Sequence, residues 1–435
     1  MYYGIDLGTT NSLIGLASTG YLSDLVPSCV DMKTGDCGAH LYDDMTAKRS
    51  FKVDISMGSQ GAPSIAASTC VLKKLKEIAG GDCVKDVVIS VPAYFTDNQR
   101  EATILAAENA RLNVKSIINE PTAAAIYIAQ KRMGLFVVYD LGGGTFDVSV
   151  IDSRFGTYDV QATGGTKCGG DNFDKDIMRF FMKQGNIKAF RLSDVERLSL
   201  QHFSCKQKIK MQKLRKPFKI DLSQWGGTEV VFTPDAYRNI MYMTFGQTVE
   251  CLKRITGTYI QDGERYEVLL VGGSTRCPFL REWISDVTGQ KVADLTYDPD
   301  RAVALGAALY AQMLENGDVT AMVSDVTRQL SIGLADGTCK VLIPANSKIP
   351  MRVEHIFVNP VKSASLELTL YQGEHTFSRD NELIGTLLWE YNEPKEAMEG
   401  QVIVTVEVDV KGIITFSAHE LLRQPKTIRL DRRLC

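Results

Sequence analysis

The sequence predicts an α/β region followed by an all-β region. Up to about residue 316, strand-like runs alternate with long helical patterns, whereas the later runs "LELTLYQG" and "VIVTVEVDVKG" place an apolar residue at every second position. This alternation is typical of half-buried strands. Turn signals at "ADGT", "QGEH" and "VKG" separate the runs at short intervals, as in a β-sandwich. We expect domains over residues 1–318 and 327–435, with "VTAMVSDV" at 319–326 as the linker.

Length and composition narrow the class of protein. At 435 residues the chain exceeds what one hydrophobic core usually covers. The 44% hydrophobic and 23% charged fractions are ordinary for a globular protein, and a net charge of −3 gives no electrostatic reason to expect nucleic acid as a partner. The ten cysteines are scattered without metal-ligand spacing. Because no run is long enough for a membrane span and strand-like residues begin at Tyr2, we expect a cytoplasmic protein without a membrane partner.

Two similar turns, "GIDLGTTNS" at residues 4–12 and "YDLGGGTFD" at residues 139–147, indicate a phosphate site. Their glycines bring no side chain between a phosphate and the backbone N–H groups, and their threonines add hydroxyl donors. Asp6 and Asp140 could orient water around Mg²⁺. A Walker loop or dinucleotide fingerprint would open a helix, but "NSLIGLA" and "FDVSVID" continue as strands. We therefore predict two hairpins that grip a triphosphate from both sides; the alternative is two merely tight hairpins.

Three further segments favour the nucleotide site over that alternative. "DVVISVPAYF" is a strand followed by a helix whose start, at Thr96 and Gln99, has capping-box spacing. "IINEPTAAA" carries Glu120 from a strand directly into a helix with Pro121 at its first position. "VLLVGGSTRCPFLREWI" is a strand, a glycine turn and a helix start, which is a usual place for an anion or a nucleoside.

Six segments together resemble the seventy-kilodalton heat-shock chaperones, the DnaK family. In order they are "GIDLGTTNS", "VPAYFTDNQR", "IINEPTAAA", "YDLGGGTFD", "VGGSTR" and "DPDRAVALGAA", and the resemblance covers nearly the whole chain. It implies an actin-like, ribonuclease H-like duplicated ATPase domain of two lobes, a linker, and a β-sandwich that binds extended peptides. The function implied is that of an ATP-dependent chaperone that hydrolyses ATP to ADP and phosphate.

The resemblance assigns roles to individual residues by position. It places Gly8, Thr9, Thr10 and Asn11 in the first phosphate loop, Gly142, Gly143, Gly144 and Thr145 in the second, and Lys208, Gly272, Gly273, Ser274 and Arg276 along the adenosine. It implies that Asp6, Asp140 and Asp147 arrange a metal ion through water, and that Lys48, Glu120, Thr145 and Asp147 are catalytic. ATP or ADP and Mg²⁺ are the implied cofactors, with K⁺ as a further ion.

The chain departs from the family pattern in several places. After Lys48 the family carries a longer segment, here shortened nearly to "SFKVDI", and the alternative for Lys48 is an exposed lysine. In "CKQKIKMQKLRKPFK" Lys208 fits, but Cys205 and Gln212 replace an acidic and a small hydroxyl residue, which leaves adenine affinity open. Because the sequence ends at "TIRLDRRLC", we expect a shortened form without the helical lid.

The implied partners are unfolded or extended peptide segments, a J-domain co-chaperone and a nucleotide exchange factor. Peptide-cleft candidates are Leu334, Phe357, Leu366 and Leu368, which as strand residues are equally good core candidates. Two other functions stay open: a nucleotide-gated scaffold with little turnover, and a phosphotransferase of the actin-like superfamily, such as a sugar kinase. The C-terminal sandwich argues against the phosphotransferase. ATP turnover, measured beside ATP and ADP affinity, separates the three.

Overall fold

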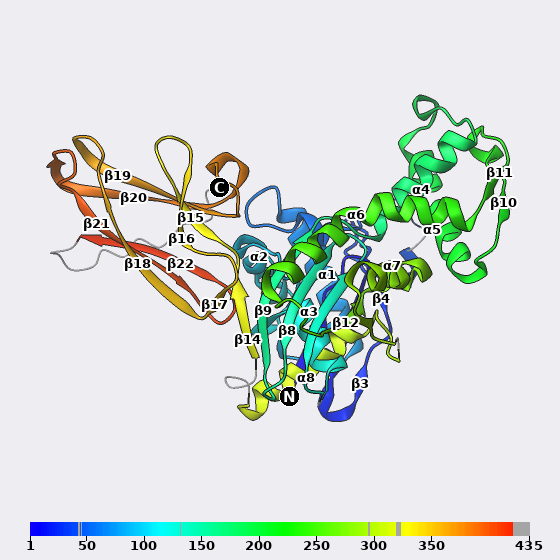
Figure 1. The fold of residues 1–435 in the computed structure, drawn as a ribbon, viewed down its shortest axis with the longest axis horizontal. Coiled ribbons are helices and arrows are strands. Elements are labelled where there is room, and N and C mark those ends of the chain that lie inside the picture. Colours follow the sequence, from blue (N-terminus) through cyan, green and yellow to red (C-terminus); the bar gives the residue numbers. More distant parts are fainter. Residues whose placement is uncertain (42–43, 45, 131, 295, 319–322, 421–435) are drawn as a thin grey trace.

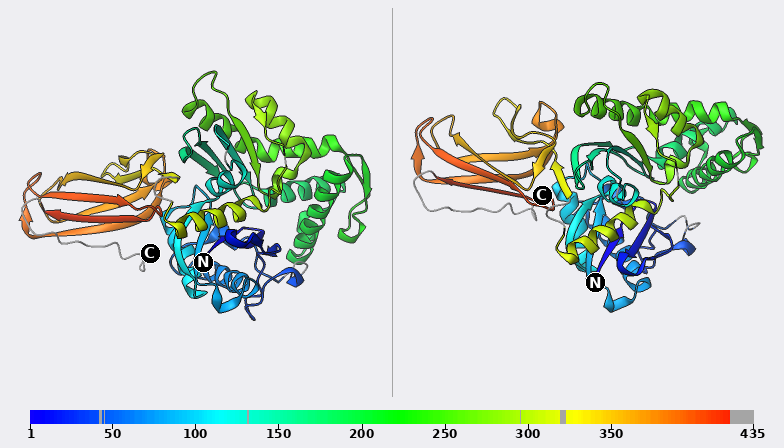
Figure 2. Two further views of the ribbon diagram at one scale, coloured as in Figure 1. Left: turned by 90° about the horizontal axis from the view of Figure 1, so that it is seen from below. Right: turned by 60° about the horizontal axis from the view of Figure 1, so that its bottom comes forward.

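The computed structural model of the chain describes residues 1–435 except 42–43, 45, 131, 295, 319–322 and 421–435. Two mixed sheets with helices form an α/β region, and a β-sandwich follows it (Figure 1). The sandwich lies at one side of the α/β region, and helices α4 (Gly170–Gln184) and α5 (Asp194–Leu214) reach out on the other side in all views (Figures 1 and 2). Within the described residues, no helix is both long enough and apolar enough to span a membrane.

The first sheet has the strand order β3-β2-β1-β5-β6, with β4 paired to β2. Strands β1 and β2 form an antiparallel hairpin, while β1, β5 and β6 run parallel. Helices α1 and α2 bury their apolar faces with this sheet, and helix α8 crosses β1 so closely that a Cβ at Gly4 would overlap the backbone of Ala308. The strands are β1 (Tyr2–Asp6), β2 (Asn11–Leu16), β3 (Tyr21–Leu22), β4 (Val26–Pro27), β5 (Asp86–Val91) and β6 (Asn113–Asn119). The helices are α1 (Ala62–Ile78), α2 (Asp97–Asn109), α3 (Glu120–Ile128) and α8 (Ala302–Asn316).

The second sheet repeats this plan in the order β13-β12-β7-β8-β9-β14-β17. Its hairpin is β7 with β8, and β12 and β13 run parallel to β7. Its strands are β7 (Leu135–Leu141), β8 (Phe146–Asp152), β9 (Tyr158–Thr166), β12 (Glu267–Val271), β13 (Lys291–Val292), β14 (Val323–Thr327) and β17 (Ser347–Ile349). Its helices, besides α4 and α5, are α6 (Pro234–Tyr259) and α7 (Pro278–Thr288), and β10 (Phe218–Ile220) pairs with β11 (Val230–Phe232).

Short 3-10 helices complete the connections of the α/β region. They are η1 (Ala17–Thr19), η2 (Ala39–Leu41), η3 (Phe51–Asp54), η4 (Gly81–Cys83), η5 (Ala189–Arg191), η6 (Ser223–Trp225) and η7 (Gly273–Arg276), while η9 (Ser378–Asp380) lies in the sandwich. Two predicted helix starts are confirmed. Thr96 and Gln99 form a capping box at the start of α2, and α3 begins at Glu120, one residue before the predicted first position at Pro121.

The C-terminal region is all-β, as predicted. One sheet has the order β16-β15-β19-β20 and the other β18-β21-β22. Val402, Val404 and Val406 are fully buried between them, which confirms the period-two pattern. The strands are β15 (Leu330–Gly333), β16 (Cys339–Ile343), β18 (Met351–Val358), β19 (Ser363–Gln372), β20 (Glu382–Lys395), β21 (Gln401–Val408) and β22 (Ile414–Glu420).

The predicted linker at 319–326 lies partly outside the described residues, because 319–322 are among the gaps. Its remaining residues belong to β14, which pairs parallel with β9 and antiparallel with β17. Val326 is buried among Tyr158 and Val160 of β9. The segment between the α/β region and the sandwich is therefore a strand of the second sheet, while the predicted domain limits stay predictions.

Candidate nucleotide site

The two glycine-rich turns face one another across the space between the sheets. A Cβ at Gly143 would overlap Thr10 Oγ1, and a Cβ at Gly144 would lie 3.0 Å from Thr9 Cγ2. Since a larger residue at either position would press against the first turn, this approach explains Gly143 and Gly144 of the second hairpin. The facing of the two hairpins is confirmed. The Gly8 N–H donates to Ser12 Oγ at 3.1 Å, so this amide already has a partner within the first hairpin.

Four carboxylates gather where the strands reach these turns. Asp6 ends β1, Asp140 and Asp147 pair across β7 and β8, and Glu120 begins α3. Burial, with the charge of Glu120 adding to it, raises the pKa of Asp6 to about 7. Burial and the neighbouring carboxylates also raise the pKa values of Asp140 and Asp147. Ser90 Oγ donates to Asp6 Oδ1 at 3.0 Å and holds that side chain in place.

Lys52 supplies an ammonium group to this cluster. It lies on η3 with 3% of its surface exposed, and its Nζ forms an ion pair with Glu120 Oε1. Burial disfavours the charged lysine, but the carboxylates of Glu120 and Asp6 outweigh this effect and raise its pKa. The lysine therefore carries its charge at neutral pH. The Nζ also lies 5.9 Å from the centre of the Phe95 ring.

The structure places a different lysine at the carboxylates from the one that the motif indicated. Lys48 is half-buried, and its recorded contacts are backbone hydrogen bonds with Val30, at 2.7 Å from N to O and 3.0 Å in the opposite direction. Ser50 then has a φ of 50°, and this left-handed turn leads into η3, so Lys52 points at Glu120. The structure therefore places Lys52 beside Glu120, and the catalytic role of Lys48 stays a prediction. Sequence reasoning missed Lys52. The shortened flank after Lys48 was the feature of the sequence that could have indicated it.

Three of the predicted adenosine residues, Lys208, Gly272 and Ser274, lie beside the second hairpin. Ser274 on η7 donates its hydroxyl to the Gly142 carbonyl at 2.8 Å. A Cβ at Gly170 would lie 2.6 Å from Ser274 Oγ and 3.5 Å from Lys208 Nζ, which places both polar groups around the start of α4. A Cβ at Gly272 would lie 2.7 Å from Asp140 Oδ1, so this turn also touches the carboxylate cluster.

On this side Lys208 and Arg276 form ion pairs, and Cys205 is a partly buried thiol. Lys208 Nζ forms a 2.8 Å ion pair with Asp174, a partner that the motifs did not reveal. Arg276 Nε donates to Asp300 Oδ2 at 2.9 Å on the surface. Burial raises the pKa of the Cys205 thiol to about 11, although Lys208 acts in the other direction. Cys205 therefore stays a neutral thiol at neutral pH.

The donors fit a cation that is held through water. Among the residues that the structure describes, no three His, Cys, Asp or Glu side chains are close enough to bind a metal ion directly. Burial and mutual repulsion nevertheless raise the pKa values of Asp6, Asp140 and Asp147, and a nearby cation would relieve both effects. Mg²⁺ usually keeps several of its waters, which suits this arrangement.

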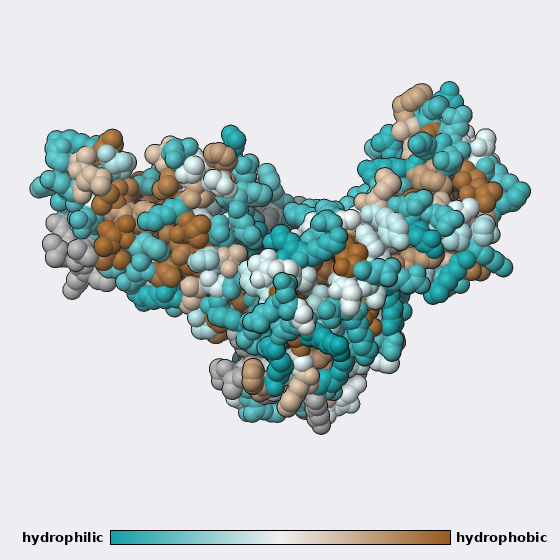
Figure 3. All heavy atoms as spheres, viewed as in Figure 1, coloured by the Kyte–Doolittle hydropathy of each residue, from teal (hydrophilic) through white to brown (hydrophobic). Residues whose placement is uncertain are grey.

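The four peptide-cleft candidates separate into core and surface. Leu366 and Leu368 are 9% and 3% exposed and belong to the sandwich core, so both side chains pack in the core and not on the surface. Phe357 is partly buried against that core, and Lys340 Nζ lies 5.0 Å from the centre of its ring. Leu334 is 43% exposed. The space-filling view shows hydrophobic residues gathered on the visible face of the sandwich (Figure 3).

Facing hairpins, buried carboxylates and an attached β-sandwich are the features of the family that the motifs indicated. The model of the family described as Hsp70 protein matches residues 39–430, so the chain belongs to the Hsp70 family. The chain is also similar to "Iron-sulfur cluster biogenesis chaperone, mitochondrial" from Saccharomyces cerevisiae (strain ATCC 204508 / S288c). The two are 35% identical over 391 residues, which cover 84% of this chain and 58% of that protein.

Proposed function

We propose that this protein is an ATP-hydrolysing chaperone of the DnaK type, with an actin-like two-lobed ATPase region and a sandwich that binds extended apolar peptides. One observation carries the ATPase part of the proposal: the two glycine hairpins face each other beside a buried cluster of carboxylates and a lysine. Family membership supports it independently.

Each group near the hairpins has a separate task in this proposal. The backbone N–H groups of Gly143 and Gly144 and the hydroxyls of Thr10 and Thr145 bind phosphate oxygens. Lys52 supplies positive charge where the transferred phosphoryl group develops negative charge. Such positioning and charge stabilisation account for most of the catalysis in phosphoryl transfer.

The carboxylates orient water molecules in this proposal. Asp6, Asp140 and Asp147 would hold Mg²⁺ through water molecules, and the ion would supply positive charge to the phosphate oxygens of ATP. Glu120 is fixed by its ion pair with Lys52 and is 8% exposed. Its second oxygen is therefore available to orient the attacking water.

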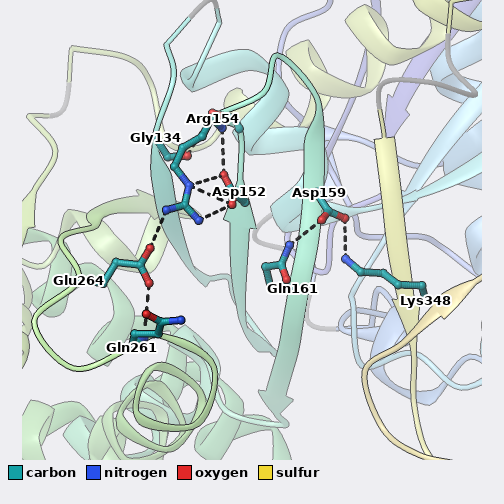
Figure 4. A network of polar contacts seen from close by, with 9 residues as sticks. Gly134, Asp152, Arg154, Asp159, Gln161, Gln261, Glu264 and Lys348 are labelled. Atoms are coloured by element: carbon teal, nitrogen blue, oxygen red, sulfur yellow. Dashed lines mark hydrogen bonds and ion pairs between the residues drawn. The ribbon is translucent and has the colours of Figure 1, made fainter.

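Communication between the two regions is supported by polar contacts at their junction. Lys348 of β17 forms a 2.5 Å ion pair with Asp159 of β9, which also accepts a hydrogen bond from Gln161 (Figure 4). Asn346 Oδ1 accepts a 2.9 Å hydrogen bond from the Thr163 N–H. Together with β14, these contacts hold β17 and the turn before it against β9, next to the start of the sandwich, and we propose that ATP favours this arrangement.

Apolar residues on the sandwich surface support the peptide-binding part. Leu334, Ile356 and Leu388 are 43%, 55% and 47% exposed. Contiguous exposed apolar surface often marks a binding site, and these side chains are the candidates for such a surface on the sandwich. The name of the yeast relative makes proteins of iron–sulfur cluster biogenesis the first clients to test, with a J-domain co-chaperone and a nucleotide exchange factor as further partners.

Turnover and peptide affinity test the proposal together. The full chain is assayed for phosphate release from ATP with and without Mg²⁺, and a labelled apolar peptide is titrated with ATP or ADP present. We expect slow, Mg²⁺-dependent hydrolysis and weaker peptide binding with ATP. Tight ATP binding without turnover would support a nucleotide-gated scaffold instead, and phosphate transfer to a sugar hydroxyl would support a phosphotransferase.

A further inference from the structure

A second polar pocket lies at the opposite end of the first sheet from the carboxylate cluster. Its volume is about 850 Å³, and it is lined by the ends of α1 and α2, by the start of β6 and by one sandwich residue, Lys411. Asn113 lines the pocket as the first residue of β6, whereas Glu120 directly follows the last. Strand β6 therefore separates the two sites along its length, and the pocket is not part of the hairpin site.

Positive charge dominates the lining. Four basic residues, Lys76, Lys85, Arg111 and Lys411, face two acidic ones, Asp82 and Glu108. The Asp82 side chain is fully exposed and lies 3.4 Å from Lys76, whose side chain is only 12% exposed. Asp82 therefore neutralises one of the four basic side chains, and the pocket keeps an excess of positive charge.

The basic side chains have hydrogen-bond donors that are not used within the protein. Lys76 Nζ donates to the Arg111 carbonyl at 3.2 Å, and Lys411 Nζ donates to the Val114 carbonyl at 3.4 Å. An ammonium group has three donors, so both lysines can bind a further acceptor. In the described part of the chain, the side chains of Lys85 and Arg111 have no recorded hydrogen bond or ion pair. The pocket thus offers a guanidinium and three ammonium groups to one ligand.

The backbone at Arg111 gives independent support. Arg111 follows the C-cap Ala110 of α2 and has a φ of 58°, in the left-handed region that favours glycine. An arginine at such a position adopts a backbone conformation that suits it less well than glycine. This position brings the guanidinium group of Arg111 to the pocket. The planar arrangement of the guanidinium N–H donors matches the oxygens of a phosphate group.

We propose that this pocket binds a small anion with two or more phosphate groups, and that the bound anion favours contact between the sandwich and the first sheet. The second half follows from Lys411. This residue belongs to the sandwich hairpin between β21 and β22, and its carbonyl accepts a 3.4 Å hydrogen bond from Arg100 of α2. When the sandwich moves away, the pocket loses one of its four cations, so a ligand that uses all four stabilises the closed arrangement. ATP hydrolysis is not needed for this binding.

Pyrophosphate is the probe, titrated calorimetrically into the full chain at constant free Mg²⁺, with a non-hydrolysable ATP analogue present to occupy the hairpin site. We expect one site, and at least fivefold weaker binding in each of Arg111→Gly, Lys85→Gln and Lys411→Gln. Arg111→Gly also relieves the left-handed backbone, so it should fold. The matched control is Arg215→Gly, since Arg215 is an exposed arginine with a φ of 50° at the end of α5.

The outcomes separate the pocket from the ATPase. The proposal is supported if Arg111→Gly and Lys85→Gln weaken pyrophosphate binding while Arg215→Gly leaves it unchanged. This result does not depend on whether the protein hydrolyses ATP. No pyrophosphate binding, or binding unaffected by all three pocket substitutions, overturns it even in an active ATPase. X-ray scattering tests the second half: pyrophosphate should lower the radius of gyration of the ADP-bound protein but not of its Arg111→Gly variant. An unchanged radius with pyrophosphate bound overturns that half.

Discussion

Arg328 of the sandwich and Asp147 of the carboxylate cluster are hydrogen-bonded to the same residue, Tyr94. The Tyr94 N–H donates to Asp147 Oδ1 at 3.2 Å, and the Tyr94 carbonyl accepts from Arg328 Nη1 at 3.0 Å. One residue of the loop before α2 therefore contacts both the proposed nucleotide site and the sandwich. If the side chain of Arg328 or of Asp147 moves, the hydrogen bonds of Tyr94 change, and Tyr94 is also bonded to the other of these two side chains.

Replacing Arg328 should uncouple the two regions. A hydrogen bond to a charged group contributes about 1.5 to 3 kcal/mol, so Arg328→Gln should reduce the ratio of peptide dissociation constants with ATP and ADP roughly tenfold. Fluorescence titration of one labelled peptide in both nucleotide states measures this ratio. Arg379→Gln is the control, because Arg379 is an exposed sandwich arginine beside Phe377. Equal ratios in the native protein and Arg328→Gln would exclude a role for this contact.

Lys52 and Lys48 give a direct comparison of two lysines. Lys52→Ala should lower kcat by roughly 10²-fold to 10³-fold, the range seen when one preorganised donor to developing charge is removed. Lys48→Ala should change kcat much less, because the recorded contacts of Lys48 are made by its backbone. Single-turnover ATP hydrolysis measures both variants, and ATP affinity is measured beside it. If Lys48→Ala is the inactive variant, the motif assignment is right and the assignment to Lys52 is wrong.

Gly143 tests the approach of the hairpins. Gly143→Ala places a methyl group against Thr10 Oγ1, which forces the two turns apart. We expect ATP affinity to fall at least tenfold while the unfolding temperature changes little. Gly257→Ala is the control, since Gly257 lies in α6 and a Cβ there would meet no atom within 4 Å. Unchanged affinity in Gly143→Ala, measured by equilibrium titration, would show that nucleotide binding does not use this contact.

Val326 tests the docking of β14. Its side chain is 6% exposed in the core of the second sheet, and burying such a side chain contributes about 1.5 to 3 kcal/mol. Val326→Asp should release β14 and make the segment a protease site in the ATP-bound protein. Val361→Asp serves as the comparison, because Val361 is 64% exposed. Protection of β14 in Val326→Asp as strong as in the native protein contradicts this prediction.

The raised pKa of Asp6 predicts a pH-dependent stability of the nucleotide-free protein. Its pKa is about 7 in the folded chain and 3.8 as the unperturbed value, so between these values the folded state holds a proton that the unfolded state has lost. Stability from this group is complete below about pH 3.8 and is lost as the pH rises through about 7. The unfolding temperature should therefore fall from pH 5 to pH 7.5, and Asp6→Asn should fall less. Asp262→Asn, at an exposed site, should match the native slope; equal slopes in all three proteins contradict the prediction.

Local patterns predicted the parts of the structure that depend on local chemistry. Glycines, threonines and the strands around them were enough to predict the facing hairpins, and alternating valines from Val402 to Val406 were enough for the sandwich. Lys52 was not predictable in this way, because its position depends on the backbone turn at Ser50 and on the distant Glu120. The strand β14 was missed for a similar reason: its pattern is weak, and its pairing partners lie in β9 and β17.

The position of β14 also determines which backbone groups face water. β14 pairs with Tyr158 and Asp159 at the start of β9, on the side of this strand that β8 does not occupy. Release of the segment would leave the start of β9 unpaired on this side, and unpaired strand edges readily accept another extended chain. We therefore expect the connecting segment to limit self-association through this part of the sheet. Loosening it, by substitution or by cleavage, should therefore raise the tendency to aggregate even where the hydrophobic core of the sheet is intact.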